Sequence, residues 1–328
     1  MADYFLSCDW GTSSFRLKLI SIPDLGIVEE TTSNKGISSV FNEWGKKGNA
    51  KQGEKQSFYL KILAEYISEL ESKINQSLAN ISIVLSGMAS SSIGIVDIPY
   101  TVVPFAVDGK DLNMHLVKNS EEFPHDVLII SGARTHNDVM RGEETQLIGC
   151  IDEMTSDPKD EQLFIFPGTH SKHIIIKDKK VQSFTTYMTG EFFALLSAQS
   201  VLHTAVIKHA DSGSASESFI KGVKDAANAN LLHIVFMVRT NDLFKTMNKE
   251  QNYDYLSGLL IGSELKELLT IQSDIFLCCN SNLEKYYRAA LTALGLDERV
   301  NVFSADKVDR SVIKGQFKIL QNKKVHHG

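Results

Sequence analysis

Hydrophobic and polar residues alternate along three short runs at the start of the chain. Residues 4–10, 15–22 and 26–32 follow this period of two, with turn-forming residues between them. Such a pattern predicts three strands in an antiparallel meander. Apolar residues then recur at helical spacing within residues 54–75, which predicts an amphipathic helix. They are Tyr59, Leu63, Tyr66, Ile67, Leu70 and Ile74.

Two compact apolar runs complete the first half, and the second half then begins as the first did. Residues 81–88 and 126–133 each predict a buried strand that leads into Ser-Gly. Residues 162–190 again predict strand, turn, strand, turn and strand. Further helices are expected over 189–200, 216–247 with a break near 228–230, 254–271, 282–295 and 306–321, and further strands over 273–279 and 299–305.

Two halves that each open on a meander and continue as α/β units predict a duplicated α/β architecture. No Pro- or Ser-rich linker separates them, so we expect the halves to pack closely. The pattern alone places the boundary within residues 131–150. We take residues 1–135 and 136–328 as the two expected domains.

Composition narrows the class of protein. A chain of 328 residues is long for one core, which favours two domains. The net charge of −6 argues against nucleic acid as the main partner. No apolar run reaches the ~18 residues typical of a membrane span, and the strand pattern beginning near Tyr4 leaves no room for a signal peptide. The four cysteines form no Cys-x-x-Cys pair, so buried thiols in a reducing, cytoplasmic compartment are expected.

The first hairpin of each half carries a Gly-Thr turn. The two turns read "DWGTSS" (9–14) and "PGTHSK" (167–172). Backbone N–H groups at such a turn can line a concavity that suits an anion, and hydroxyl groups add donors. Either turn alone is also typical of an ordinary tight hairpin. Their recurrence favours phosphate binding by Gly11, Thr12, Ser13, Gly168, Thr169, Ser171 and Lys172.

The first turn also begins with an aspartate, Asp9. A carboxylate would repel a phosphate directly, whereas beside a phosphate it suits Mg²⁺, which takes one or two carboxylates together with phosphate oxygens. Asp9 is therefore the candidate metal residue. Other phosphate motifs are missing, since the chain has neither a P-loop sequence nor Gly-x-Gly-x-x-Gly. His170 and His173 would point to opposite faces of a hairpin, so a histidine metal site is not expected.

These turns resemble the phosphate-binding hairpins of the actin, sugar-kinase and heat-shock ATPase superfamily. Within it, the chain resembles the 2-dehydro-3-deoxygalactonokinase family from Asp9 to about Gly295. The segments that carry the resemblance are "DWGTSSFR", "LSGMASSSIGIVDIPY", "DVMRGEETQLIG", "FPGTHSKHI", "YMTGEFFALL" and "LSGLLIGSEL". The resemblance implies two actin-like (ribonuclease H-like) domains, N-terminal for the sugar and C-terminal for the nucleotide, with an interdomain ATP cleft.

The resemblance further implies transfer of phosphate from ATP, with Mg²⁺, to the 6-hydroxyl of 2-dehydro-3-deoxy-D-galactonate. Such transfer needs a carboxylate to take the hydroxyl proton. Glu143, which follows Gly142, fits the family position best, and Asp138 is the second candidate. Glu143 and Glu144 could instead merely stabilise a helix N-terminus. Arg16 takes a position that faces the transferring phosphate.

The remaining site residues are expected on loops. The loop at 86–92, after the strand at 81–86, and the two arginines that flank the acidic motif are candidates for binding the sugar acid and its carboxylate; they are Met88, Ser90, Ser91, Arg134 and Arg141. Asn280 and Asn282 are expected on the adenine side, and an N-cap role for one of these residues competes with that interpretation. Single serines of the loop could equally belong to a plain turn.

Two other functions stay open at this point. The chain departs from the family pattern at Ser91, Ile95, Asn137 and His173, so a kinase of the same fold for another keto-deoxy sugar acid or sugar is the first alternative. The second alternative is a non-catalytic actin-like nucleotide-binding protein. In such a protein the acidic motif would have no function. The expected partner is a small molecule, and the sequence leaves open whether the chain forms a homodimer.

Overall fold

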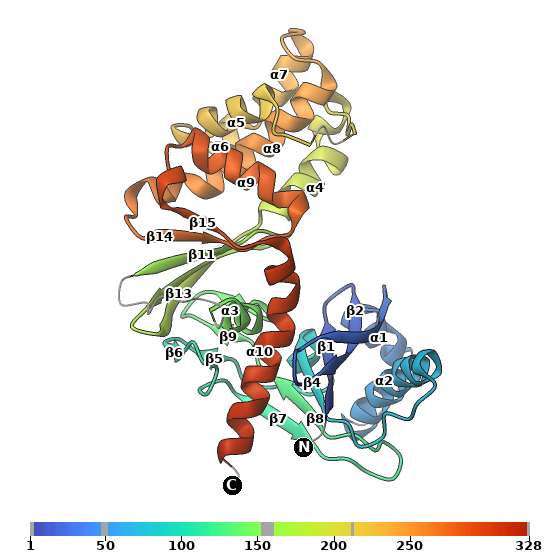
Figure 1. Ribbon diagram of the computed structural model, residues 1–328. Helices are drawn as coiled ribbons and strands as arrows, with labels where there is room; N and C mark the ends of the chain where they lie inside the picture. The colour runs from blue at the N-terminus through green and yellow to red at the C-terminus, as the bar shows by residue number, and fades with distance from the viewer. Residues whose placement is uncertain (1–2, 47–51, 152–160, 211–212, 327–328) are drawn as a thin grey trace. The chain divides into compact units, whose positions relative to one another are not determined.

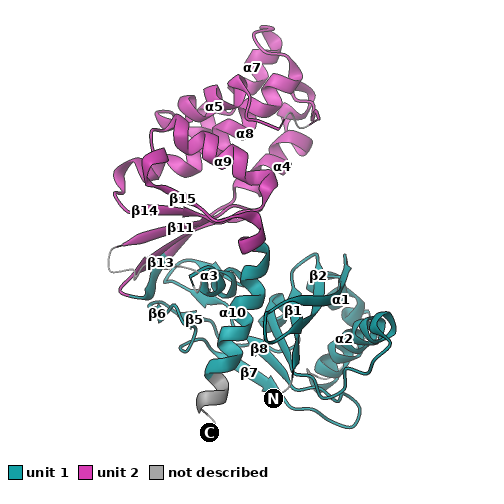
Figure 2. Ribbon diagram, viewed as in Figure 1, with its two compact units in different colours: residues 1–157, 179–183, 309–328 teal, residues 158–178, 184–308 magenta. Residues whose placement is uncertain are grey.

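The computed structural model describes residues 3–46, 52–151, 161–210 and 213–326 (Figure 1). Its contacts divide the chain into two compact units (Figure 2). Unit 1 contains residues 1–157, 179–183 and 309–328, and unit 2 contains residues 158–178 and 184–308. The expected domains, residues 1–135 and 136–328, stay a prediction, and in this division of contacts the helix that follows Gly142 belongs to unit 1. The last helix also returns to unit 1, which no local pattern indicated.

Unit 1 is built on a six-stranded sheet of order β3-β2-β1-β4-β8-β7. The three strands of the predicted meander are present, and β1 pairs in parallel with β4, which pairs in parallel with β8. The strands are β1 (Tyr4–Trp10), β2 (Phe15–Ser21), β3 (Ile27–Ser33), β4 (Ile83–Gly87), β7 (Met114–Val117) and β8 (Val127–Ile130). Short strands β5 (Thr101–Val102), β6 (Phe105–Ala106), β9 (Ala133–Arg134) and β10 (Val139–Met140) were not predicted, because two-residue strands carry no period.

Helices of unit 1 cover this sheet and extend from it. They are α1 (Ile37–Gly45), α2 (Gln52–Ile74), the single turn η1 (Met88–Ser90), α3 (Glu143–Ile151) and α10 (Ala305–His326), whose first residues belong to unit 2. The predicted apolar stripe of α2 is confirmed, since Tyr59, Leu63, Ile67 and Leu70 are buried against the sheet. Each such side chain contributes roughly 1.5–3 kcal/mol of burial free energy. The short helix α1 was missed.

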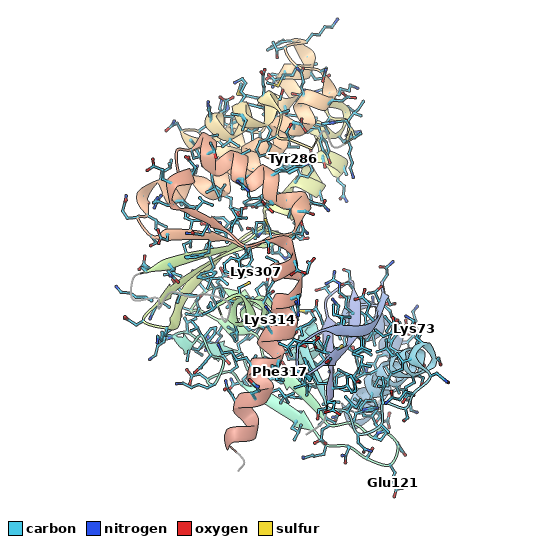
Figure 3. All side chains as sticks on the ribbon, viewed as in Figure 1. Lys73, Glu121, Tyr286, Lys307, Lys314 and Phe317 are labelled. Atoms are coloured by element: carbon cyan, nitrogen blue, oxygen red, sulfur yellow. The ribbon has the colours of Figure 1, made fainter. Side chains whose placement is uncertain are left out.

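Helix α10 is joined to the sheet of unit 1 by specific contacts. Phe317, labelled in Figure 3, stacks on Phe5 with 5.8 Å between ring centroids. The Gln316 amide donates to the Cys8 carbonyl and to Ser86 Oγ, at 2.9 Å each. These contacts tie the C-terminal helix to β1 and β4, the two strands that lead into the first Gly-Thr turn and the Ser-Gly loop.

Unit 2 repeats the strand order of the first sheet. Its strands run β15-β14-β11-β12-β13, with β14 parallel to β11 and to β15. They are β11 (Gln162–Phe166), β12 (Ser171–Lys177), β13 (Lys180–Tyr187), β14 (Asp274–Leu277) and β15 (Val300–Val302). The first residues of β13 belong to unit 1, where Lys180 and Val181 pair with β6. A meander followed by parallel strands in both sheets confirms the predicted duplicated α/β fold.

The helices of unit 2 agree closely with the expected ones. They are α4 (Thr189–Gln199), α5 (Glu217–Ala227), α6 (Leu231–Ile234), α7 (Met237–Leu243), α8 (Lys249–Leu265) and α9 (Ser281–Ala293), with single turns η2 (Val201–Ala205), η3 (Lys266–Thr270) and η4 (Asp297–Arg299). The predicted break near 228–230 separates α5 from α6, where Asn230 caps α6. Helix α8 begins five residues before the expected position because Asn248 and Gln251 form a capping box.

All four cysteines are buried and free, as expected. Within the described residues, no helix combines the length and apolar character needed to cross a membrane.

Candidate functional site

The first Gly-Thr turn joins β1 to β2 in unit 1. The Gly11 amide donates to the Ser14 carbonyl at 2.9 Å and closes the turn, which leaves Thr12 and Ser13 exposed. The start of α1 supports this turn, because the Ile37 and Ser38 amides donate to the carbonyls of Gly11 and Thr12. Gly36 allows this approach, since a Cβ there would lie 2.3 Å from the Thr12 carbonyl oxygen. The helix that the sequence did not reveal thus helps to hold the predicted turn.

Asp9 and Arg16 face each other across the base of this turn. They are opposite residues in the β1–β2 register, and Nη1 of Arg16 lies 3.1 Å from Oδ2 of Asp9. The Asp9 side chain is 29% exposed, so it can still be reached from solvent. Desolvation by burial raises the pKa of Asp9 above its ordinary value, and the Arg16 guanidinium opposes that change. The two sequence candidates therefore form one charged pair.

The acidic motif reaches the same part of unit 1. Helix α3 starts at Glu143, and the charge of Glu143 acts on the pKa of Asp9 in the upward direction. Gly87 lies between Asp9 and the residue before α3. A Cβ on Gly87 would lie 3.2 Å from Asp9 Oδ1, and a Cβ on Gly142 would lie 3.7 Å from the Gly87 Cα. The structure thus brings together Asp9, the Ser-Gly loop and the start of α3.

The two glutamates at this helix start differ in burial. Glu143 is half-buried, and its Oε2 accepts the Arg141 amide at 3.0 Å. Glu144 is fully buried and accepts the Gly142 amide at 2.7 Å and the Thr145 hydroxyl at 3.0 Å. Burial, and next the charge of Glu143, raise the pKa of Glu144 to about 7. Both residues stabilise the helix start, but only Glu143 keeps an accessible carboxylate.

Arg141 connects the acidic motif to the predicted sugar loop. Its Nη1 donates to Ser90 Oγ at 2.5 Å, and its guanidinium lies 4.3 Å from the ring centroid of Tyr100. Met88 is half-buried in the same loop. Ser90 and Ser91 are both buried, and the Ser91 hydroxyl donates to the Met88 carbonyl at 2.7 Å, as expected for a plain turn. Tyr100 was not identified from the sequence.

Two further candidates lie on the hairpin formed by β9 and β10. Arg134 is exposed at the end of β9. Asp138 is in the connecting turn, where its Oδ1 accepts the amide of Val139 at 2.7 Å and its own amide donates to Thr135. Its carboxylate therefore shapes the turn.

The second Gly-Thr turn joins β11 to β12 in unit 2. Gly168 is half-buried and Thr169 is exposed, so the tip of the turn is open. Ser171 and Lys172 are buried; the Ser171 hydroxyl donates to Glu264 at 2.6 Å, and the Lys172 ammonium donates to the His170 carbonyl at 3.3 Å. The hydroxyl of Ser171 is thus directed into the fold, whereas the sequence had assigned it to a phosphate.

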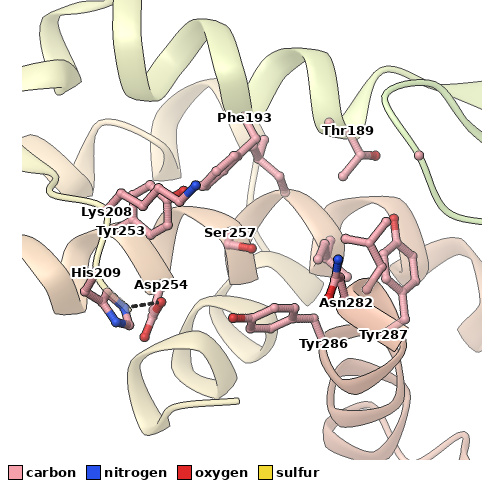
Figure 4. A pocket seen from close by; sticks show the side chains of 15 residues that line it. Thr189, Phe193, Lys208, His209, Tyr253, Asp254, Ser257, Asn282, Tyr286 and Tyr287 are labelled. Carbon is pink, nitrogen blue, oxygen red and sulfur yellow. Dashed lines mark hydrogen bonds and ion pairs between the residues drawn. The ribbon is translucent and has the colours of Figure 1, made fainter. Parts of the chain in front are cut away.

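A cavity of about 480 Å³ lies beside this turn within unit 2 (Figure 4). It is bounded by Gly168, by the start of α4, by one side of α8 and by the start of α9. The lining side chains are mostly aromatic or polar: Thr189, Phe193, Lys208, His209, Tyr253, Asp254, Ser257, Asn282, Tyr286 and Tyr287, with Leu260, Ile261 and Leu283. Its volume and its aromatic walls are typical of a small-molecule site.

A histidine–aspartate pair lies at one end of this cavity. Nε2 of His209 lies 2.9 Å from Oδ1 of Asp254, and the hydrogen bond to Asp254 raises the pKa of His209. Lys208 precedes His209 in the chain and also lines the cavity. These groups can hydrogen-bond a polar ligand. No sequence pattern pointed to them, because they come from separate segments that only the fold brings together.

The two candidate asparagines have different roles in the structure. Asn280 caps α9, since its side chain accepts the Leu283 amide at 3.2 Å. This confirms the competing N-cap interpretation for Asn280. Asn282 lines the cavity. The adenine-side prediction therefore remains for Asn282.

Groups of three or more His, Cys, Asp or Glu side chains placed to bind a metal ion are absent from the described part of the chain. A single carboxylate such as Asp9 still fits Mg²⁺, which is bound through few protein ligands when phosphate oxygens complete its shell.

Comparison with known proteins identifies the family of the chain. The family model of 2-keto-3-deoxy-galactonokinase matches residues 9–318. A Rhizobium meliloti protein named as a probable 2-dehydro-3-deoxygalactonokinase is 29% identical over 94% of this chain and 95% of its own length. The Escherichia coli 2-dehydro-3-deoxygalactonokinase is 29% identical over 90% and 92%. A solved Sinorhizobium meliloti structure, provisionally named for the same activity, is 28% identical, covers 96% of both chains and has a TM-score of 0.78.

Proposed function

This chain belongs to the 2-keto-3-deoxy-galactonokinase family, and we propose that it transfers the γ-phosphoryl group of ATP to the 6-hydroxyl of 2-dehydro-3-deoxy-D-galactonate. The observation that carries this proposal is that the start of α3, at Glu143, lies near Asp9: a Cβ on Gly142 would be 3.7 Å from the Gly87 Cα, and a Cβ on Gly87 would be 3.2 Å from Asp9 Oδ1. Phosphoryl transfer needs a carboxylate for the acceptor proton and positive charge at the phosphates. Unit 1 contains groups suited to both tasks.

In this proposal Glu143 accepts the proton of the 6-hydroxyl as the hydroxyl oxygen attacks the γ-phosphorus. The residue is half-buried and its Oε2 accepts the Arg141 amide, which orients the carboxylate. Asp138 is the second candidate for this role. Arg16, placed beside Asp9, donates to the phosphoryl oxygens that carry charge in the transition state.

Mg²⁺, when bound, neutralises charge on the phosphate oxygens. Asp9 is the residue proposed to hold it, directly or through water. Its partly exposed carboxylate lies near the end of β1, just before a turn whose Thr12 and Ser13 are exposed. Gly11, Thr12 and Ser13 of this turn, and Gly168, Thr169 and Lys172 of the second turn, are proposed to bind the phosphates, with Ser171 acting from within the fold.

The nucleotide is assigned to unit 2 and the sugar acid to unit 1. The cavity of unit 2 reaches from Gly168 of the second turn to Asn282, which suits a nucleoside whose phosphates extend toward the turn. In unit 1, Arg141 and Arg134 are proposed to bind the substrate carboxylate, and Met88 to contact the sugar chain. Ser90 is fully buried, so its proposed part in the sugar site is to hold Arg141 through its Oγ. A soluble small molecule is thus the proposed partner, and a cytoplasmic location is the proposed setting.

The departures from the family pattern do not favour another substrate. Ser91 and Ile95 are buried, at 6% and 3% exposure, and His173 is buried against Glu264. Because these side chains point into the fold, they affect packing rather than the surface that a sugar acid would meet. Asn137 is exposed in the β9–β10 turn.

Purified protein with ATP, Mg²⁺ and a panel of 2-keto-3-deoxy sugar acids that differ at C4 tests the proposal. We expect ADP release with 2-dehydro-3-deoxy-D-galactonate, and nuclear magnetic resonance of the product should place the phosphate on C6. Faster turnover of another acid would support the alternative kinase. Nucleotide binding without ADP release from any acid would overturn phosphoryl transfer.

A further inference from the structure

One buried carboxylate in unit 2 accepts four hydrogen bonds. Glu264, near the end of α8, is 2% exposed. Its Oε1 accepts the Ser171 hydroxyl at 2.6 Å and lies 3.0 Å from His173 Nε2, and its Oε2 accepts the Thr189 and Tyr287 hydroxyls at 2.5 and 2.8 Å. The four partners come from β12, α4 and α9. One side chain therefore joins three elements that are far apart in the sequence.

The hydrogen bonds, together with His173, hold the pKa of this carboxyl below its ordinary value even though burial alone would raise it. An ionised carboxylate accepts hydrogen bonds and donates none. Each surrounding hydroxyl must therefore point its proton at Glu264, which fixes the rotamers of Ser171, Thr189 and Tyr287. Such a buried set is stable only when every partner is present.

The elements held by Glu264 are those that form the second Gly-Thr turn and one end of the cavity. Ser171 directly follows the turn. Thr189 starts α4, and the next residue, Gly190, packs so closely on the turn that a Cβ would lie 2.6 Å from the Gly168 carbonyl oxygen. The Glu191 amide donates to the Thr169 carbonyl at 3.1 Å. The turn is thus supported from β12 and from α4 at once.

Glu264 itself does not line the cavity, whereas Thr189 and Tyr287 do (Figure 4). We propose that Glu264 is a positioning residue that holds the second Gly-Thr turn in the shape that binds nucleotide phosphates. This inference rests on the proposed function, because it assumes that the turn meets the phosphates of a nucleotide. It assigns to the buried residue a role in phosphate affinity and none in contacting the base.

The alternative is that Glu264 only stabilises unit 2. A purely stabilising residue would change the unfolding temperature and leave the affinity of the folded protein unchanged. A positioning residue would also weaken ligands that carry phosphates, and would spare the nucleoside. Comparing ADP with adenosine separates the two roles without relying on turnover.

Tyr287→Phe is the mildest test, because it removes one hydroxyl and keeps the ring that lines the cavity. Tyr255→Phe is its matched control: Tyr255 is also buried in unit 2 and donates to a carboxylate, that of Asp225, at the same 2.8 Å, but it lies outside the cavity lining. Both variants lose one buried hydrogen bond, so their unfolding temperatures should fall by similar amounts. Glu264→Gln is the stronger change.

Binding of ADP and of adenosine is measured by calorimetry and, for weak binding, by ligand-observed magnetic resonance. We expect Tyr287→Phe to weaken ADP about 3- to 10-fold and Glu264→Gln about 10-fold or more, with adenosine changed by less than about 2-fold. Tyr255→Phe should change neither affinity. Equal weakening of both ligands, or a Tyr287→Phe that behaves as Tyr255→Phe, would overturn the proposal even if Glu264→Gln failed to fold. Wild-type protein that binds no ADP would instead refute the proposed function.

Discussion

Arg16 and Asp9 are opposite residues of two paired strands, and their charged groups lie 3.1 Å apart. The pair is at the base of the first Gly-Thr turn, so a group bound at the turn would meet a cation and an anion together. This arrangement keeps the carboxylate of Asp9 oriented although it is partly exposed.

Asp9→Asn keeps the shape of the side chain and removes its charge. If Asp9 holds Mg²⁺, the Mg²⁺ concentration needed for half-maximal turnover should rise at least roughly 10-fold, the loss seen even for indirect metal partners. Titration of Mg²⁺ at fixed ATP measures this change. Asp24→Asn, at an exposed turn of the same unit, serves as the control. An unchanged Mg²⁺ requirement in Asp9→Asn would remove Asp9 from the metal site.

Glu143→Gln tests the proton acceptor. Loss of a general base lowers turnover by about 10²- to 10⁴-fold, while affinity for ADP should stay the same. Asp138→Asn is the matched comparison, and we expect it to retain most activity because its carboxylate caps its own turn. Steady-state kinetics and ADP calorimetry provide both readouts. An inactive Asp138→Asn beside an active Glu143→Gln would transfer the role to Asp138.

Glu144 should make stability depend on pH. Its pKa rises from 4.5 to about 7 on folding, so the folded chain binds the proton more tightly than the unfolded chain. The free energy of unfolding therefore decreases as pH rises through this interval, and the contribution is constant above it. Between about pH 5 and pH 8, the free energy of unfolding measured with urea should therefore fall by roughly 1–3 kcal/mol less in Glu144→Gln than in the wild type. A pH slope equal to that of the wild type would contradict this assignment.

Gly315 lets α10 lie directly on α3. A Cβ at Gly315 would be 1.9 Å from the Thr145 carbonyl oxygen, so Gly315→Ala must push the helices apart. We expect a loss of about 1–3 kcal/mol or more in unfolding free energy, and lower turnover because α3 carries Glu143. Gly53→Ala, on α2 with nothing near its Cβ, should instead gain about 0.5–1 kcal/mol. Equal stability of the two variants would refute the close helix crossing.

Asn280 and Asn282 should separate stability from binding. Asn280→Ala removes a helix cap and should cost about 1 kcal/mol of unfolding free energy without changing ADP affinity. Asn282→Ala should weaken ADP and adenosine together, since Asn282 lines the cavity. Thermal unfolding and calorimetry on both variants make the comparison. The reverse pattern would mean that Asn280 contacts the nucleotide.

Local pattern was sufficient for much of this protein. The meanders, the stripe on α2 and the break between α5 and α6 depend on neighbours within a few residues, and all could be predicted. The paired Gly-Thr turns were also visible, because turn chemistry is written in adjacent residues. Short strands such as β9 and β10, and the helix α1, were not, since they are too brief to show a period.

The sequence by itself determined the duplicated α/β fold and the candidate residues of each turn. Only the tertiary structure decided which candidates face one another and which are directed inward: Asp9 pairs with Arg16, Ser171 turns to Glu264, and Asn280 caps α9. It also placed the last helix in unit 1 and assembled the cavity from five separate segments. The physical reason is that burial and long-range hydrogen bonds join residues far apart in the chain. Gln316 and Cys8, for example, are hydrogen-bonded although they are 308 positions apart, and no local stretch of sequence contains both.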